Sequence, residues 1–205
     1  MNWESTLYSI PGVLLGLTIH ECCHALAAWK LGDSTARDQG RITLNPLRHI
    51  DLIGFLFLVF AGFGWAKPVQ FNPAFLRHPR RDKALIAAAG PLSNLVLGVI
   101  LVFLLRLFLA LGHNLNEGVF RLVLLTLFYA ITINFGLFVF NLIPLPPLDG
   151  SHIVFSGLNL SPETEGRIMR IGAPLLFIIL IIQNRAGINI LPIGRIVRAM
   201  IDLLL

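Results

Sequence analysis

Residues 18–26 read TIHECCHAL and place two histidines and a glutamate inside an otherwise apolar segment. From residue 7 to residue 29 the neighbours are almost all aliphatic residues, alanine, glycine or cysteine. This stretch is long enough to cross a bilayer as a helix. An ionisable side chain at that depth costs about 3 kcal/mol unless it is paired, hydrated or bound to something. The motif therefore predicts a functional site within a membrane helix.

The chain as a whole has the composition of an integral membrane protein. Of its 205 residues, 56% are hydrophobic and 13% are charged, and the mean hydropathy is +0.78, unlike an ordinary soluble domain. No polar stretch is long enough to fold separately, so we expect one integral membrane domain over residues 1–205. The formal charge of +5 comes from short loops beside apolar spans, which indicates membrane topology and not nucleic-acid binding.

The apolar stretches predict four spanning helices and one segment of another kind. The predicted spans are about 7–29, 84–111, 119–143 and 171–184. A further stretch, 52–66, is short, rich in glycine and flanked by basic loops. Because lysine and arginine collect on the cytoplasmic side, both loops stay there only if this segment is membrane-embedded or re-entrant. We therefore expect it not to span.

The remaining stretches complete an all-α polytopic fold. We expect the N-terminus outside and an amphipathic helix at about 191–205 that lies at the membrane interface or packs on the protein. Residues 41–51 and 67–73 carry β-type and turn-type residues, so short membrane-associated strands are also expected there. The predicted class is a helical membrane protein that possesses, in addition, these short strands.

The spacing in the first span suits metal binding. His20 and His24 are four residues apart, so they project from one face of a helix and can bind the same ion. Zinc hydrolases use two such imidazoles and a third ligand, keep one position for water, and need a carboxylate as general base. Glu21 lies on the flank of that face. A transporter or a proton or ion pathway would also use buried His, Glu and Asp, and this alternative stays open here.

A third ligand can come from the stretch NFGLFVFNLIPLPPLDG at 134–150. Asp149 follows three prolines that end the third span, and it precedes a glycine. His24 is six residues before Lys30, about 9 Å along a helix. The histidines therefore lie toward the same cytoplasmic end as Asp149, and the two halves of the site can meet.

Four motifs in this order resemble those of the site-2 protease family, peptidase family M50: HECCH at 20–24, GWAKPVQFNP at 64–73, AGPLSNL at 89–95 and NLIPLPPLDG at 141–150. The resemblance implies a three-helix catalytic core and one Zn²⁺ per chain, bound by His20, His24 and Asp149. It implies that Glu21 is the catalytic base. It also implies that Asn141 contacts the substrate or the oxyanion.

The resemblance further implies regulated intramembrane proteolysis, in which the substrates are transmembrane segments of other proteins. No PDZ or CBS segment is visible in the sequence, so we expect a short form of the family. We expect a multi-pass protein of a prokaryotic cell membrane with its active site toward the cytoplasm. The partners are the lipid bilayer and a transmembrane protein, and the sequence is compatible with an oligomer.

The AGPLSNL motif carries two interpretations. Gly90 and Pro91 indicate close packing of a second helix against the first, because small residues let membrane helices approach. Asn94 either belongs to that packing or faces the active site.

Overall fold

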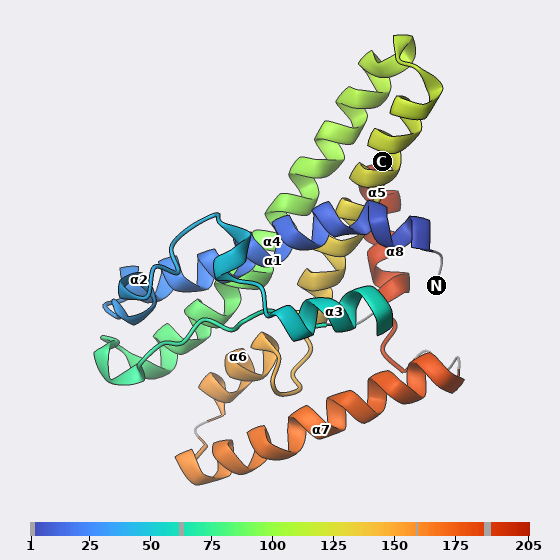
Figure 1. The fold of residues 1–205 in the computed structure, drawn as a ribbon. Coiled ribbons are helices and arrows are strands. Elements are labelled where there is room, and N and C mark those ends of the chain that lie inside the picture. Colours follow the sequence, from blue (N-terminus) through green and yellow to red (C-terminus); the bar gives the residue numbers. More distant parts are fainter. Residues whose placement is uncertain (1–2, 62–63, 159, 187–189) are drawn as a thin grey trace.

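Three long helices form the centre of the protein. The structure is a computed structural model that describes residues 3–61, 64–158, 160–186 and 190–205. The central helices are α1 (Trp3–Lys30), α4 (Pro79–Leu111) and α5 (Glu117–Asn141). In the described part of the chain, these three are long and apolar enough to cross a membrane. Figure 1 shows α4 and α5 as a projecting hairpin that α1 crosses near its base. The predicted all-α polytopic fold is confirmed.

Shorter elements surround this centre. They are α2 (Thr35–Asp38), η1 (Pro46–Arg48), α3 (Leu52–Ala61), η2 (Pro73–Phe75), η3 (Gly112–Asn114), α6 (Asp149–Gly157), α7 (Pro162–Ala186) and α8 (Ile193–Leu204). In Figure 1, α7 runs along the lower edge, below α6. This helix contains the predicted fourth span, 171–184, but it is not one of the three candidates above. A fourth span therefore stays a prediction.

Small residues and an apolar cluster hold the central helices together. A Cβ added to Gly12 of α1 would lie 2.9 Å from the Cβ of Ala130 on α5, so the two helices touch closely at this glycine. The apolar cluster joins α4, α5 and α8, and its buried members are Leu101, Val102, Leu105, Ala130, Ile131, Phe135, Val197 and Ile201. The C-terminal amphipathic helix thus packs its apolar face on the protein.

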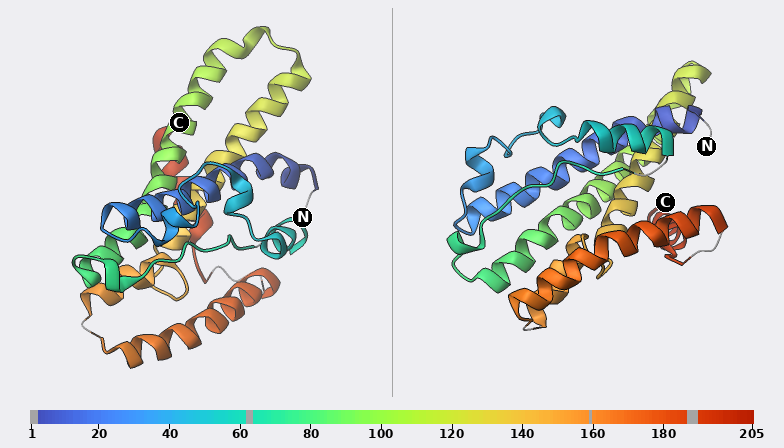
Figure 2. Two further views of the ribbon diagram at one scale, coloured as in Figure 1. Left: turned by 60° about the vertical axis from the view of Figure 1, so that its left-hand side comes forward. Right: turned by 60° about the horizontal axis from the view of Figure 1, so that its bottom comes forward.

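Residues 31–51 and 64–76 run along α1 (Figure 2), and the stretches before and after α3 meet. Ile50 and Ala66 form an isolated antiparallel bridge, and the Lys67 N–H donates to the His49 carbonyl at 2.8 Å. The segment that contains α3 thus begins and ends at the same place. The intervening α3 has ten residues, about 15 Å, half the thickness of the hydrocarbon core. Residues 62–63 of the predicted embedded segment lie outside the described residues.

The expectation of short strands at 41–51 and 67–73 is wrong for the described residues, where the only pairing is that isolated bridge. Each segment contains an Asn-Pro pair that starts a 3-10 turn instead. The side chain of Asn45 accepts the Leu47 N–H, and that of Asn72 accepts the Ala74 N–H. The prolines that follow have no N–H for a β-ladder, so the turns replace the strands.

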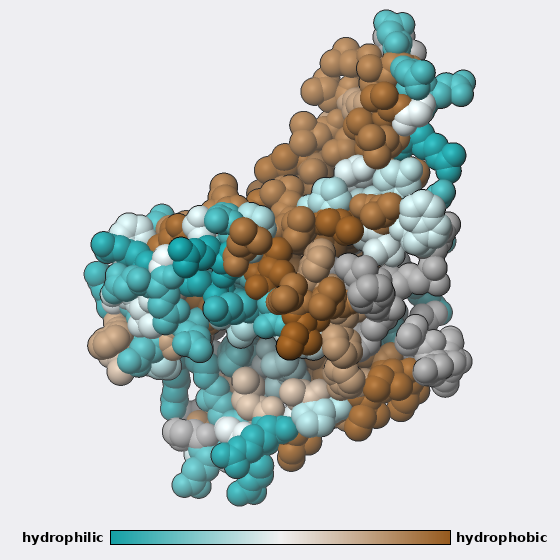
Figure 3. All heavy atoms as spheres, viewed as in Figure 1, coloured by the Kyte–Doolittle hydropathy of each residue, from teal (hydrophilic) through white to brown (hydrophobic). Residues whose placement is uncertain are grey.

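The surface divides into an apolar and a polar part. Figure 3 shows apolar side chains over the projecting α4–α5 hairpin and polar side chains around α2, at the other end of the molecule. The apolar surface matches what a lipid-facing hairpin needs. In this division, the end of α1 that follows the histidines lies beside the polar part around α2.

Candidate metal centre

The structure brings the three predicted metal ligands together. His20 and His24 lie on α1, and Asp149 is the first residue of α6. The two Nε2 atoms are 3.0 Å apart, and Asp149 Oδ2 lies 3.2 Å from His20 Nε2 and 3.4 Å from His24 Nε2. Both histidines are buried. All three ligand atoms lie within 4.8 Å of one another, which is the spacing that one shared ion requires.

The hydrogen bonds of the histidines define their tautomers. His20 Nδ1 lies 2.6 Å from Asn94 Oδ1, and His24 Nδ1 lies 2.7 Å from the Ile86 carbonyl oxygen. Because both partners are acceptors, each Nδ1 donates, and a ring that is neutral then presents a lone pair at Nε2. Two nitrogen lone pairs and a carboxylate oxygen therefore face one another. Asp149 Oδ2 is buried and makes no hydrogen bond.

Such a group of acceptors repels itself unless a cation lies among them. Two neutral imidazoles and a carboxylate are the ligands that catalytic zinc sites use, with one position left for water. Hydrogen bonds at the far nitrogen of each imidazole are the usual way of orienting the ligand. The donor set therefore fits Zn²⁺.

A buried amide network extends from His20 across the three central helices. Asn94 Nδ2 donates to the Gly16 carbonyl at 3.1 Å and to Asn134 Oδ1 at 3.0 Å. Asn134 Nδ2 in turn donates to the Ala130 carbonyl at 2.8 Å. Both asparagines are fully buried. Since the side-chain nitrogen of Asn94 donates to α1 and α5, its Oδ1 is the atom that accepts the hydrogen bond from His20 Nδ1.

We expect Asn94→Leu to weaken zinc binding by about 10- to 100-fold, because changes to groups that only orient a ligand have this effect. Leucine keeps the volume but removes the acceptor that fixes the His20 tautomer. Competition with a chromophoric zinc chelator measures the affinity of the purified protein. Ser93→Ala is the control, because Ser93 bonds only the Gly90 carbonyl of its own helix in the described contacts. Equal affinities of Asn94→Leu and wild type would contradict the role of Asn94.

Helix α4 also contacts the imidazoles through its backbone. A Cβ added to Gly90 would overlap His24 Nε2 and lie 2.7 Å from His20 Cε1. The absence of a side chain at this position therefore lets α4 pass directly beside the metal ligands. The close packing expected at Gly90 is present, and Asn94 contacts His20; whether Asn94 also faces an active-site water stays a prediction.

Glu21 is buried and contacts the loops beside α1. Its Oε2 accepts the Val69 N–H at 2.8 Å and lies 3.8 Å from Arg41 Nη2. Asn141 ends α5, and its Nδ2 donates to the Leu137 carbonyl of the same helix at 3.1 Å. The predicted roles of Glu21 in catalysis and of Asn141 at the substrate stay predictions.

The sequence did not single out Arg41 or Asn134. Arg41 reads as one of several topology-setting cations in a loop, and its contact with Glu21 depends on the fold. Asn134 carries a usable signal, because an amide inside an apolar span has to find a polar partner.

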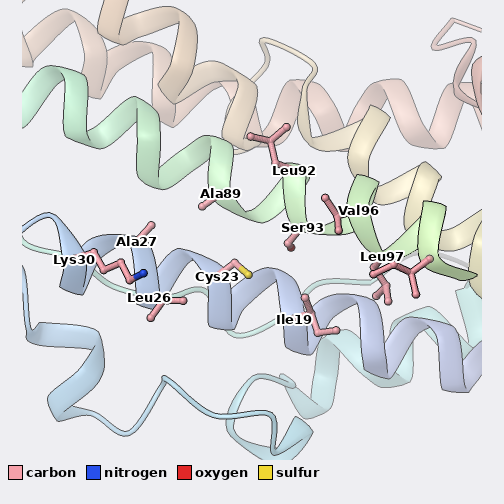
Figure 4. A pocket seen from close by; sticks show the side chains of 11 residues that line it. Ile19, Cys23, Leu26, Ala27, Lys30, Ala89, Leu92, Ser93, Val96 and Leu97 are labelled. Atoms are coloured by element: carbon pink, nitrogen blue, oxygen red, sulfur yellow. The ribbon is translucent and has the colours of Figure 1, made fainter.

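An apolar groove lies between α1 and α4 (Figure 4). It measures about 550 Å³ and is lined by Ile19, Cys23, Leu26, Ala27, Lys30, Ala89, Leu92, Ser93, Val96, Leu97 and Ile100. None of the predicted site residues lines this groove. The converging ligand atoms belong to residues outside this lining, so the groove is separate from the candidate metal centre.

Comparisons with known proteins agree with this centre. The model of "Peptidase family M50" matches residues 116–182. A Bacillus subtilis protein named "Putative zinc metalloprotease YwhC" is 45% identical over 147 residues, which cover 72% of this chain and 67% of that protein. Rip2 of Mycolicibacterium smegmatis, with the same description, is 33% identical over 162 residues, 76% of this chain and 58% of Rip2. No solved structure matches the chain.

Proposed function

Because the chain belongs to the site-2 protease family, peptidase family M50, and is a zinc metalloprotease, we propose that it hydrolyses peptide bonds within or near transmembrane segments of other membrane proteins. One observation carries the proposal. Three acceptor atoms, two from α1 and one from α6, converge beside α1, a helix long and apolar enough to cross a membrane. A zinc site at that place meets substrates that stay in the bilayer.

The residues of the site take different roles in the proposed hydrolysis. We assign the zinc to His20, His24 and Asp149. Zinc held by such ligands polarises a carbonyl group and lowers the pKa of water. Glu21, next to His20 in the chain, takes a proton from the attacking water and then gives it to the leaving amine. Asn94 keeps the His20 ring in the tautomer that the ligand set requires.

The membrane sets two further requirements. A peptide bond in a regular membrane helix is shielded by the helical hydrogen bonds, so the substrate has to unwind locally before it is cut. We assign the site to the cytoplasmic end of α1, because the basic residues of the flanking loops favour that side. The pairing of Ile50 with Ala66 supports the interpretation of residues 52–66 as re-entrant, since the segment ends where it began.

A proton or ion pathway is the alternative use of buried His, Glu and Asp. Two observations favour the protease. The tautomers leave three unprotonated acceptors facing one another, which suits a bound cation better than a chain of proton donors and acceptors. The relatives that the chain matches are described as zinc metalloproteases.

We expect the purified protein to contain about one zinc per chain, as a catalytic site of this type holds one ion, and to cleave a single-span model substrate in vesicles. A strong chelator removes the zinc and stops cleavage, and added Zn²⁺ restores both. Elemental analysis and gel mobility of the substrate measure the two quantities. Cleavage that persists in zinc-free protein, or zinc-loaded protein that cleaves no single-span substrate, would count against the proposal.

A further inference from the structure

Arg41 is an arginine in an unusual environment. It follows α2 in the chain, yet only 5% of it is exposed, whereas arginine is seldom buried without a partner. Its Nη2 donates to the Lys67 carbonyl and lies 3.8 Å from Glu21 Oε2. The guanidinium thus stands between the residue predicted as catalytic base and the backbone of a distant loop.

The same loop binds Glu21 directly. Two residues beyond Lys67, the Val69 N–H donates to Glu21 Oε2 at 2.8 Å. Lys67 is held from the other side as well, because its N–H donates to the His49 carbonyl at 2.8 Å. The 67–69 segment is therefore fixed at its start by Arg41 and His49, and this fixes the amide that reaches Glu21.

Among the described contacts, Arg41 is the cation that lies beside Glu21. His49 is fully buried, and its Nε2 bonds the Thr43 carbonyl at 2.9 Å. Burial, together with nearby Arg41, lowers the pKa of His49, so this ring is neutral at pH 7. A buried guanidinium and a buried carboxylate each need an opposite charge. Arg41 and Glu21 meet this need for each other.

We propose that Arg41 is a positioning residue for Glu21: it holds the Glu21 carboxylate and the 67–69 segment in one arrangement, so that Oε2 is bound by the protein and Oε1 exchanges the proton. Both described contacts of the carboxylate fall on Oε2, which makes its two oxygens inequivalent. The inference rests on the proposed function, because it concerns how the base of that reaction is presented.

Arg41→Gln tests the proposal, with Arg41→Lys as the conservative variant and Arg37→Gln as the control for lost charge. Arg37 is exposed, and its guanidinium lies over the Trp29 ring at 5.3 Å. We expect kcat of Arg41→Gln to fall by about 10- to 100-fold, because a small misplacement of a catalytic group has effects of that size. KM and zinc content remain at wild-type values, and Arg41→Lys recovers part of kcat. A wild-type kcat in Arg41→Gln, or loss of zinc from it, would overturn the proposal.

A second measurement does not depend on activity. The thermal unfolding midpoints of zinc-loaded wild type, Arg41→Gln, Glu21→Gln and the double variant form a double-mutant cycle. We expect the two single shifts to be non-additive, because each variant removes the same ion pair. Additive shifts would overturn the link between Arg41 and Glu21. If wild type cleaves no substrate, the proposed function fails, and this cycle still decides whether Arg41 holds Glu21.

Discussion

Glu21→Gln is expected to keep its zinc and to lose cleavage by at least about 100-fold, because a positioned general base contributes 10²- to 10⁴-fold. Glutamine has the shape of glutamate and retains an oxygen that can accept the Val69 N–H. Its amide cannot take a proton from water at neutral pH. The variant therefore removes the proposed proton transfer and leaves the ligands His20, His24 and Asp149 in place.

The measurement pairs cleavage of a single-span substrate with zinc content, in wild type, Glu21→Gln and Asp149→Asn. Asp149→Asn is the matched acid-to-amide change, and it should lose zinc and activity together because Asp149 Oδ2 lies at both imidazoles. The two variants thereby distinguish the loss of a general base from the loss of a metal ligand. Wild-type cleavage by Glu21→Gln would show that Glu21 is not the general base. Loss of zinc from this variant would indicate that Glu21 is itself a metal ligand.

Gly90→Ala is expected to weaken zinc binding by more than about 100-fold, because changes that only reorient a ligand already cost 10- to 100-fold. The new methyl group would overlap His24 Nε2 and lie 2.6 Å from His24 Cε1. Either the imidazole turns away from Asp149 or α4 moves away from α1. Both movements separate the ligand atoms, although alanine favours the helix more than glycine does.

Gly136→Ala is the control for this variant. Gly136 also lies inside a central helix, α5, and a Cβ there meets nothing within 4 Å. It should bind zinc as wild type does, and circular dichroism should show that both variants remain helical. Wild-type zinc affinity in Gly90→Ala would mean that the space beside the imidazoles is larger than the structure indicates.

The sequence predicts the parts of the site that follow from local geometry. Spacing alone places His20 and His24 on one face of a helix. The prolines before Asp149 end a span and so place a carboxylate at the right depth. The structure brings these residues together as expected. The long apolar stretches likewise predict α1, α4 and α5, because bilayer thickness sets their length.

The parts that escaped prediction depend on contacts between distant segments. Arg41 and Glu21 are twenty residues apart, and their pairing requires the intervening loop to return along α1. The expected strands failed because short β-type stretches say little without a partner strand, and each of these stretches also contains an Asn-Pro turn. Asn134 reaches His20 only through Asn94, so two helix packings determine its role.

A row of α4 residues beside the candidate metal centre joins helix packing to the support of both imidazoles. Ile86, Gly90 and Asn94 are spaced by four residues and so form one stripe along α4. The Ile86 carbonyl accepts a hydrogen bond from His24, and the side-chain oxygen of Asn94 accepts one from His20. Between them, Gly90 lies directly beside both imidazole rings. Parting α1 from α4 would break all of these contacts at once. The packing of these two helices and the orientation of the two imidazoles are therefore one and the same structural requirement.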